Sequence, residues 1–163
     1  MDIIEFRRMA IFNENFGEHI HAEIIINGKP FAEIAEEFER LAVERGRGKY
    51  NGFEYVYEYA SVLYESLAND KSCDENPEQK PLMICSGCHE AGCWGLYVTV
   101  DVDDNEIVWH DINNYHLSRN RPDRNWWDYS VFPSYRFNQV QYGSALEQLK
   151  QIASEPHRGW YER

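Results

Sequence analysis

Residues 94–102 alternate between apolar side chains and small or polar ones, and this alternation limits the fold more than any other feature of the chain. In an extended strand, successive side chains point to opposite faces. One face of this strand carries Trp94, Leu96, Val98, Val100 and Val102. Asp104-Asn105 supplies a turn, and residues 107–110 (IVWH) return as the partner strand. The sequence therefore predicts an antiparallel hairpin.

Other parts of the chain carry the periodicities of further strands and helices. Predicted strands span 2–12, 19–26, 81–85 and 131–137. Predicted helices span 31–44, 54–68 and 138–153. The second helix follows from its length and apolar spacing, although its Tyr and Val content favours a strand. Polar connections are predicted at 69–80 and 113–129, and Asn27-Gly28 is a predicted turn. Together these elements predict an α+β fold over a single domain, residues 1–163. It would have an antiparallel β-sheet, two to three helices and a Cys-rich knuckle at a strand start.

The predicted helix at 31–44 has a glutamate-rich face. Its apolar positions recur at helical spacing and are Phe31, Ile34, Ala35, Phe38, Leu41 and Ala42. The glutamates that lie between these apolar positions are Glu33, Glu36, Glu37 and Glu39. We expect these glutamates to form the solvated outer face of the helix.

The chain is acidic, with a net charge of −12 over 163 residues. A field of that sign repels phosphate backbones, so nucleic acid is an unfavourable partner and a basic protein a favourable one. No apolar run is long enough to span a membrane. The first residues, MDIIEFRRMA, lack the pattern of a secretory signal, so we expect a soluble cytoplasmic protein. None of these features predicts an oligomeric state.

Three cysteines lie within nine residues, in the order Cys85-Ser-Gly-Cys88-His-Glu-Ala-Gly-Cys93. Zinc favours four ligands in a tetrahedron, and a C-x-x-C turn places two thiolates on one ion. Clustered cysteines in a reducing compartment favour a metal over structural disulfides. We therefore predict a structural zinc knuckle at Cys85, Cys88 and Cys93. Cys73 is the first candidate for the fourth ligand, and His110, at the end of the paired strand, is the second.

The same cysteines allow other chemistry. Cys85 and Cys88 can form the dithiol of a thiol–disulfide oxidoreductase, although no predicted helix follows them to lower a thiol pKa. A zinc site with an open position would make Glu90 the nearest base of a zinc hydrolase. The cysteines can also be reduced side chains packed in a turn. On these grounds we expect a binding or inhibitor-type protein in preference to an enzyme.

One segment concentrates basic and aromatic residues in this acidic chain. It holds Arg119, Arg121, Arg124, Trp126 and Trp127. Arg with Trp is the composition of an interface anchor, so these residues are a candidate binding surface. The alternative is an internal arrangement in which the arginines pair with local aspartates and the tryptophans pack into the core. A second small group is His19 and His21, which share one face of a predicted strand and could bind a metal if a third ligand joined them.

Residues 82–146 also resemble a known pattern. Gly92-Cys93-Trp94 is followed by Val108-Trp109 and His116, then by Trp127-Asp128-Tyr129, Phe132, Phe137, Gln141-Tyr142 and Ala145-Leu146. This order is similar to a group of small, uncharacterised bacterial proteins with a C-x-C-G-x-x-G-C-W core and a later W-D-Y…F-x-F…Q-Y-x-x-A-L pattern. The chain departs from it in having C-x-x-C and in having His89 where the group has glycine. The resemblance implies a bacterial origin and no particular activity.

Overall fold

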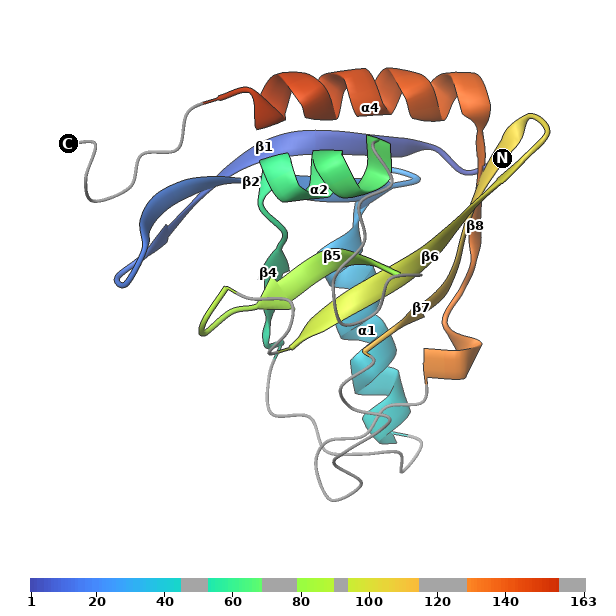
Figure 1. The fold of residues 1–163 in the computed structure, drawn as a ribbon. Coiled ribbons are helices and arrows are strands. Elements are labelled where there is room, and N and C mark those ends of the chain that lie inside the picture. The colour runs from blue at the N-terminus through green and yellow to red at the C-terminus, as the bar shows by residue number, and fades with distance from the viewer. Residues whose placement is uncertain (45–52, 69–78, 90–93, 115–128, 156–163) are drawn as a thin grey trace.

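The structure is a computed structural model that describes residues 1–44, 53–68, 79–89, 94–114 and 129–155. These residues form two antiparallel sheets, with the strand orders β1-β2-β3 and β4-β5-β6-β7-β8 (Figure 1). They also form three α-helices, labelled α1, α2 and α4, and one short 3-10 helix, η1 (Tyr129–Val131). The predicted α+β class, with antiparallel sheets and two to three helices, is confirmed.

The first sheet is built on a long hairpin. Strand β1 (Ile4–Asn13) pairs with β2 (Gly17–Ile26) over its whole length, from Ile4↔Ile26 to Asn13↔Gly17. The chain then turns at Asn27 and Gly28, both with positive φ, into the two-residue strand β3 (Lys29–Pro30). A turn of this kind suits Asn-Gly because both residues tolerate the left-handed conformation. The two strands and the turn predicted here are confirmed.

The second sheet contains the predicted hairpin. Its strands are β4 (Tyr55–Tyr57), β5 (Lys80–Cys85), β6 (Gly95–Asp103), β7 (Glu106–Asn113) and β8 (Tyr135–Asn138). The β6–β7 pair confirms the hairpin, but the alternation of β6 does not separate a buried face from an exposed one. Leu96, Tyr97 and Val98 are all fully buried, because both faces of this part of the sheet are covered. Val102 is 69% exposed, near the end of the hairpin that extends past the other elements (Figure 1).

Two isolated bridges connect the sheets. On one side His21 of β2 pairs with Tyr59, just after β4, and the Ala22 amide donates to the Glu58 carbonyl at 3.3 Å. On the other side Asp2, just before β1, pairs with Phe137 of β8. The Asp2 amide donates to the Arg136 carbonyl there, at 2.9 Å. The five-stranded sheet is therefore bridged to the β1–β2 hairpin near both of its edge strands, β4 and β8.

Within the described residues, three α-helices accompany the sheets. Helix α1 (Phe31–Glu44) and helix α4 (Gln139–Ala153) match their predictions, and α4 begins where the Asn138 side chain accepts the amides of Val140 and Gln141. The prediction of one helix over 54–68 is wrong in its first part, which forms β4, whereas helix α2 occupies Ala60–Ala68. Helices α2 and α4 contact each other, and α4 runs along β1 (Figure 1). In the described residues, no helix has both the length and the apolar content needed to cross a membrane.

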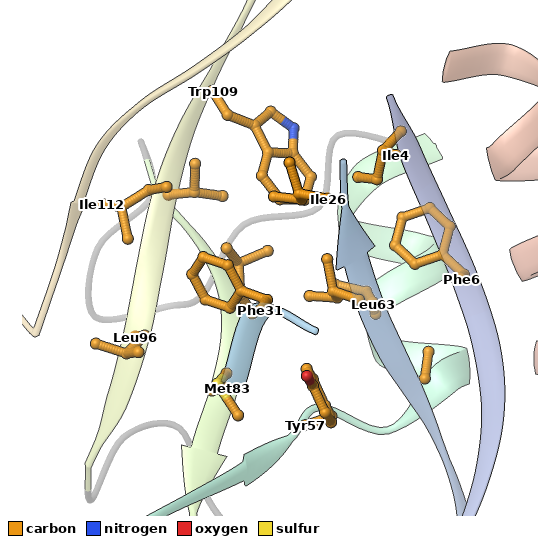
Figure 2. Close-up of a cluster of buried hydrophobic side chains, with 14 of the residues drawn as sticks. Ile4, Phe6, Ile26, Phe31, Tyr57, Leu63, Met83, Leu96, Trp109 and Ile112 are labelled. Carbon is orange, nitrogen blue, oxygen red and sulfur yellow. The ribbon is translucent and has the colours of Figure 1, made fainter. Parts of the chain in front are cut away.

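One hydrophobic core joins both sheets and the helices. Figure 2 shows its side chains pointing toward one another from β1, β2, α1, β4, α2, β5, β6 and β7. The largest fully buried side chains of this core are Trp109, Phe6, Phe31 and Phe137. Full burial of each such side chain stabilises the fold by about 1.5–3 kcal/mol. The Trp109 indole also donates to the Tyr142 hydroxyl at 3.1 Å, so its polar atom is satisfied.

Candidate functional site

The cysteine turn begins where β5 ends. Cys85 is the last residue of that strand, and the His89 amide donates to the Cys85 carbonyl at 2.9 Å, which closes the turn around Cys88. The Ser86 amide donates to the Glu54 carbonyl at 3.1 Å and ties the turn to the residue before β4. Cys85 and Cys88 are both partly exposed thiols, not joined to each other by a disulfide. The turn therefore presents two cysteines, three residues apart, on a fixed backbone.

His89 holds this turn to the β1–β2 hairpin. Its φ of 56° lies in the left-handed region, which is uncommon for a residue other than glycine. The side chain is only 6% exposed and packs against the rings of Phe16 and His21, with ring centroids 5.8 and 5.6 Å away. Its Nε2 lies 3.4 Å from the Asn13 amide nitrogen. Burial lowers the pKa of His89, and the neighbouring His19 lowers it further.

The buried Nδ1 of His89 has no hydrogen-bond partner among the residues that the structure describes. If the Asn13 amide donates to Nε2, the neutral imidazole carries its proton on Nδ1. A buried N–H group without an acceptor is costly. Nothing in the local sequence indicates that His89 points into the protein, because its neighbours in the chain are polar or small.

His19 and His21 share one face of β2, as the sequence predicts, and Tyr59 lies against both. The Tyr59 ring stacks on His21 with centroids 4.5 Å apart and meets His19 edge-on at 5.5 Å. His21 is fully buried, and its Nδ1 lies 2.7 Å from the Tyr57 carbonyl, to which it donates. His19 Nε2 lies 2.7 Å from the Phe16 carbonyl. Both imidazoles therefore help to hold the hairpin and β4 together.

Of the two candidates for the fourth zinc ligand, only His110 lies among the described residues. His110 lies on β7 opposite Thr99, and its Nε2 is 2.6 Å from an Asp101 carboxylate oxygen. Cys73, Glu90 and Cys93 lie outside the described residues, as do Arg119, Arg121, Arg124, Trp126 and Trp127. Within the described parts of the chain, no three His, Cys, Asp or Glu side chains are arranged to hold a metal ion. The zinc site thus remains a prediction that needs ligands from outside these parts.

A second polar cluster lies close to the cysteine turn and was not predicted. Glu39 of α1 is 1% exposed, and its carboxylate accepts a hydrogen bond from the Tyr129 hydroxyl of η1 (Tyr129–Val131). The Tyr55 hydroxyl of β4 also interacts with this carboxyl group and lowers its pKa, and it influences Tyr129 as well. The Asn114 amide donates to the Tyr55 hydroxyl at 2.9 Å. We call Glu39, Tyr55, Asn114 and Tyr129 the Glu39 network.

The expectation that Glu39 belongs to a solvated face is wrong, and Leu41, expected inward, is 41% exposed. Glu39 follows Ala35 by one helical turn, so it borders the apolar stripe, and the buried side of α1 is rotated toward it. Burial raises the pKa of Glu39 to about 7. The two tyrosine hydroxyls lower it, and the nearby Glu54 and Glu36 raise it by repulsion.

Tyr55 connects the two clusters. Its backbone pairs with Cys85 in the β4–β5 register, and its ring stacks on Trp94 with centroids 6.3 Å apart. The Trp94 indole nitrogen is buried and has no hydrogen-bond partner among the described residues. The cysteine turn and the Glu39 network thus lie on two sides of one tyrosine.

Comparison with known proteins does not assign the chain to a family. No protein-family model, curated protein or solved structure matches the chain. The resemblance to the bacterial group with the C-x-C-G-x-x-G-C-W core remains an expectation drawn from the sequence.

Proposed function

We propose that this chain is a zinc-binding protein, in which Cys85 and Cys88 supply two thiolate ligands, Cys93 a third and Cys73 the fourth. The observation that supports this proposal most directly is the closed turn in which the His89 amide donates a hydrogen bond to the Cys85 carbonyl. This bond fixes two partly exposed thiols in the C-x-x-C arrangement that tetrahedral zinc sites use. His110 remains the second candidate for the fourth position, and its bond to Asp101 leaves Nδ1 for a metal.

The proposed role of the metal is structural. Four protein ligands leave no open position for water, so the ion would stabilise the turn and what it contacts. The cysteine turn already contacts the residue before β4 and, through His89, the β1–β2 hairpin. Metal bound at its base would therefore support the junction of the two sheets.

We further propose that the protein acts by binding, with a basic protein as the partner. The net charge of −12 supports a basic partner and disfavours nucleic acid. Reductase chemistry at Cys85 and Cys88 has less support, because in the described residues the turn leads to a left-handed His89 and not to a helix N-terminus. A hydrolase with Glu90 as base has no observation in its favour.

The test is metal content. Protein purified without added metal should contain about one zinc per chain, and Cys85→Ser or Cys88→Ser should lose it, whereas the neighbouring Ser86→Ala should keep it. At a zinc concentration of about 100 times Kd, binding adds about 2.7 kcal/mol of stability. For a chain of this size, chelation should then lower Tm by about 5–11 °C.

Zinc-free protein whose thiols react equally fast with and without a chelator would refute the proposal. If Cys85→Ser abolished a disulfide reductase activity while Tm stayed unchanged, the oxidoreductase would replace it. Replacement of Cys73 and of His110, each by Ala, decides between the two candidates for the fourth ligand.

A further inference from the structure

The Glu39 network ties together four separate parts of the fold. Glu39 comes from α1, Tyr55 from β4, Asn114 from the residue after β7, and Tyr129 from η1. All four side chains are at most 7% exposed. The residues that follow Tyr129 form a tight corner, in which the Phe132 amide donates to the Tyr129 carbonyl at 2.9 Å. Phe132 and Tyr129 also pack on Phe38, one residue before Glu39.

Among the residues that the structure describes, no cation balances the charge of Glu39. No Lys, Arg or His among the described residues forms an ion pair with it, and the charged groups that influence it are Glu36 on its own helix and Glu54 before β4. The other groups that face it are the hydroxyls of Tyr55 and Tyr129, and both tyrosines have a raised pKa because they are buried. An isolated buried carboxylate is unfavourable unless hydrogen bonds compensate for the lost solvation.

We propose that the Glu39 network is a proton-dependent latch: while the Glu39 carboxyl carries a proton, the corner Tyr129–Phe132 is held against α1, and loss of the proton lets this corner open more often. The geometry supports this because the same carboxyl that α1 contributes is bonded by the first residue of the corner. Opening of the corner exposes the carboxyl to water, where the charged form is favoured.

The direction of the effect follows from linkage. In the open state, Glu39 has the ordinary glutamate value of 4.5, whereas in the closed state its pKa is about 7. The closed state therefore binds the proton more tightly, and it is most favoured at low pH. Its advantage declines as pH rises from about 4.5 to about 7 and is then fully lost. Between pH 5.5 and pH 8.5 the equilibrium constant for opening should increase about 30-fold.

The test is amide hydrogen exchange of the full-length chain at these two pH values, after correction for the intrinsic rates. The reporter is the Phe132 amide, and the Phe16 amide of the β1–β2 turn serves as a distant comparison. We expect the protection of Phe132 to fall about 30-fold from pH 5.5 to 8.5. In Glu39→Gln this pH dependence should disappear. In Glu33→Gln, on an exposed position of the same helix, it should remain.

An unchanged pH dependence in Glu39→Gln would overturn the proposal, as would equal protection of Phe132 at both pH values in the unaltered chain. If Glu39→Gln does not fold, a carbon-detected NMR titration of the Glu39 carboxyl in the unaltered protein decides the matter. A midpoint near 7 supports the latch, and a midpoint near the ordinary value of 4.5 refutes it.

Discussion

Gln141 of α4 takes the place of a neighbouring strand at the edge of β1, and its removal should be unusually destabilising for a single amide. Its Nε2 donates to the Ile4 carbonyl at 2.6 Å, and its Oε1 accepts the Ile4 amide at 3.2 Å. Ile4 itself is fully buried. The residue thus satisfies both polar groups of one buried peptide position, across 137 residues of sequence.

In Gln141→Leu both groups of Ile4 lose their partner. A buried donor or acceptor left unsatisfied costs about 1–3 kcal/mol. Gln141 is half-buried, so water can reach part of the gap, and we use about 1–1.5 kcal/mol for each group. The expected loss in the free energy of unfolding is about 2–3 kcal/mol. Leu and Gln have similar helix propensities, so the helix itself contributes little to the difference.

Urea denaturation of Gln141→Leu and of the unaltered chain measures this loss. Gln148→Leu, at an exposed position of the same helix, is the matched control and should stay within about 0.5 kcal/mol of the unaltered chain. With a slope of about 2 kcal/mol per molar urea, Gln141→Leu should lower the midpoint by about 1–1.5 M. If Gln141→Leu and Gln148→Leu unfold at the same midpoint, the amide does not support β1 in the way that its contacts indicate.

Two further changes test single groups. Burial raises the pKa of Glu58 to about 7, above its ordinary value of 4.5, so its share of stability is greatest at low pH and declines as pH rises to 7. Urea denaturation at pH 5 and at pH 8 measures how much the free energy of unfolding decreases between these two pH values. In Glu58→Gln this decrease should be smaller by about 2.5 kcal/mol than in the unaltered chain. The same decrease in both proteins would contradict this. Asn138→Ala removes the side chain that accepts the Val140 and Gln141 amides at the start of α4, and should lower the free energy of unfolding by about 1 kcal/mol. Loss of less than half of that amount would show that water replaces the cap.

Local sequence patterns predicted elements whose partners are close in the chain. The β6–β7 hairpin and the helix at 31–44 have a periodicity that a short window reveals. The error at 54–68 has a physical cause: Val56, Tyr59, Ala60, Leu63 and Leu67 recur at helical spacing, so the segment fits one helix as well as it fits a strand followed by a helix. The break at Glu58 carries neither Gly nor Pro, and it depends on pairing of Tyr55–Tyr57 with β5, which no local pattern shows.

The site was predicted only as far as its residues are neighbours in sequence. The cysteine turn follows from C-x-x-C and Gly87, and the shared face of His19 and His21 follows from strand geometry. The Glu39–Tyr129 contact joins residues 90 positions apart, so a glutamate beside the apolar stripe of α1 looked like any exposed carboxylate. Likewise, His89 could be placed inside the protein only once the β1–β2 hairpin was seen to pass over the cysteine turn.

The position of Tyr55 determines how the results on the two clusters must be interpreted together. Its backbone pairs with Cys85, its ring stacks on Trp94, and its hydroxyl belongs to the Glu39 network. A shift of this one side chain therefore changes both clusters, and any free-energy coupling between them must be reciprocal. Coupling requires an element with two arrangements. The Glu39 carboxyl changes charge near pH 7, so a metal that favours one position of Tyr55 would also change the proton affinity of Glu39. Metal content and stability of the cysteine variants are thus comparable only at a fixed pH.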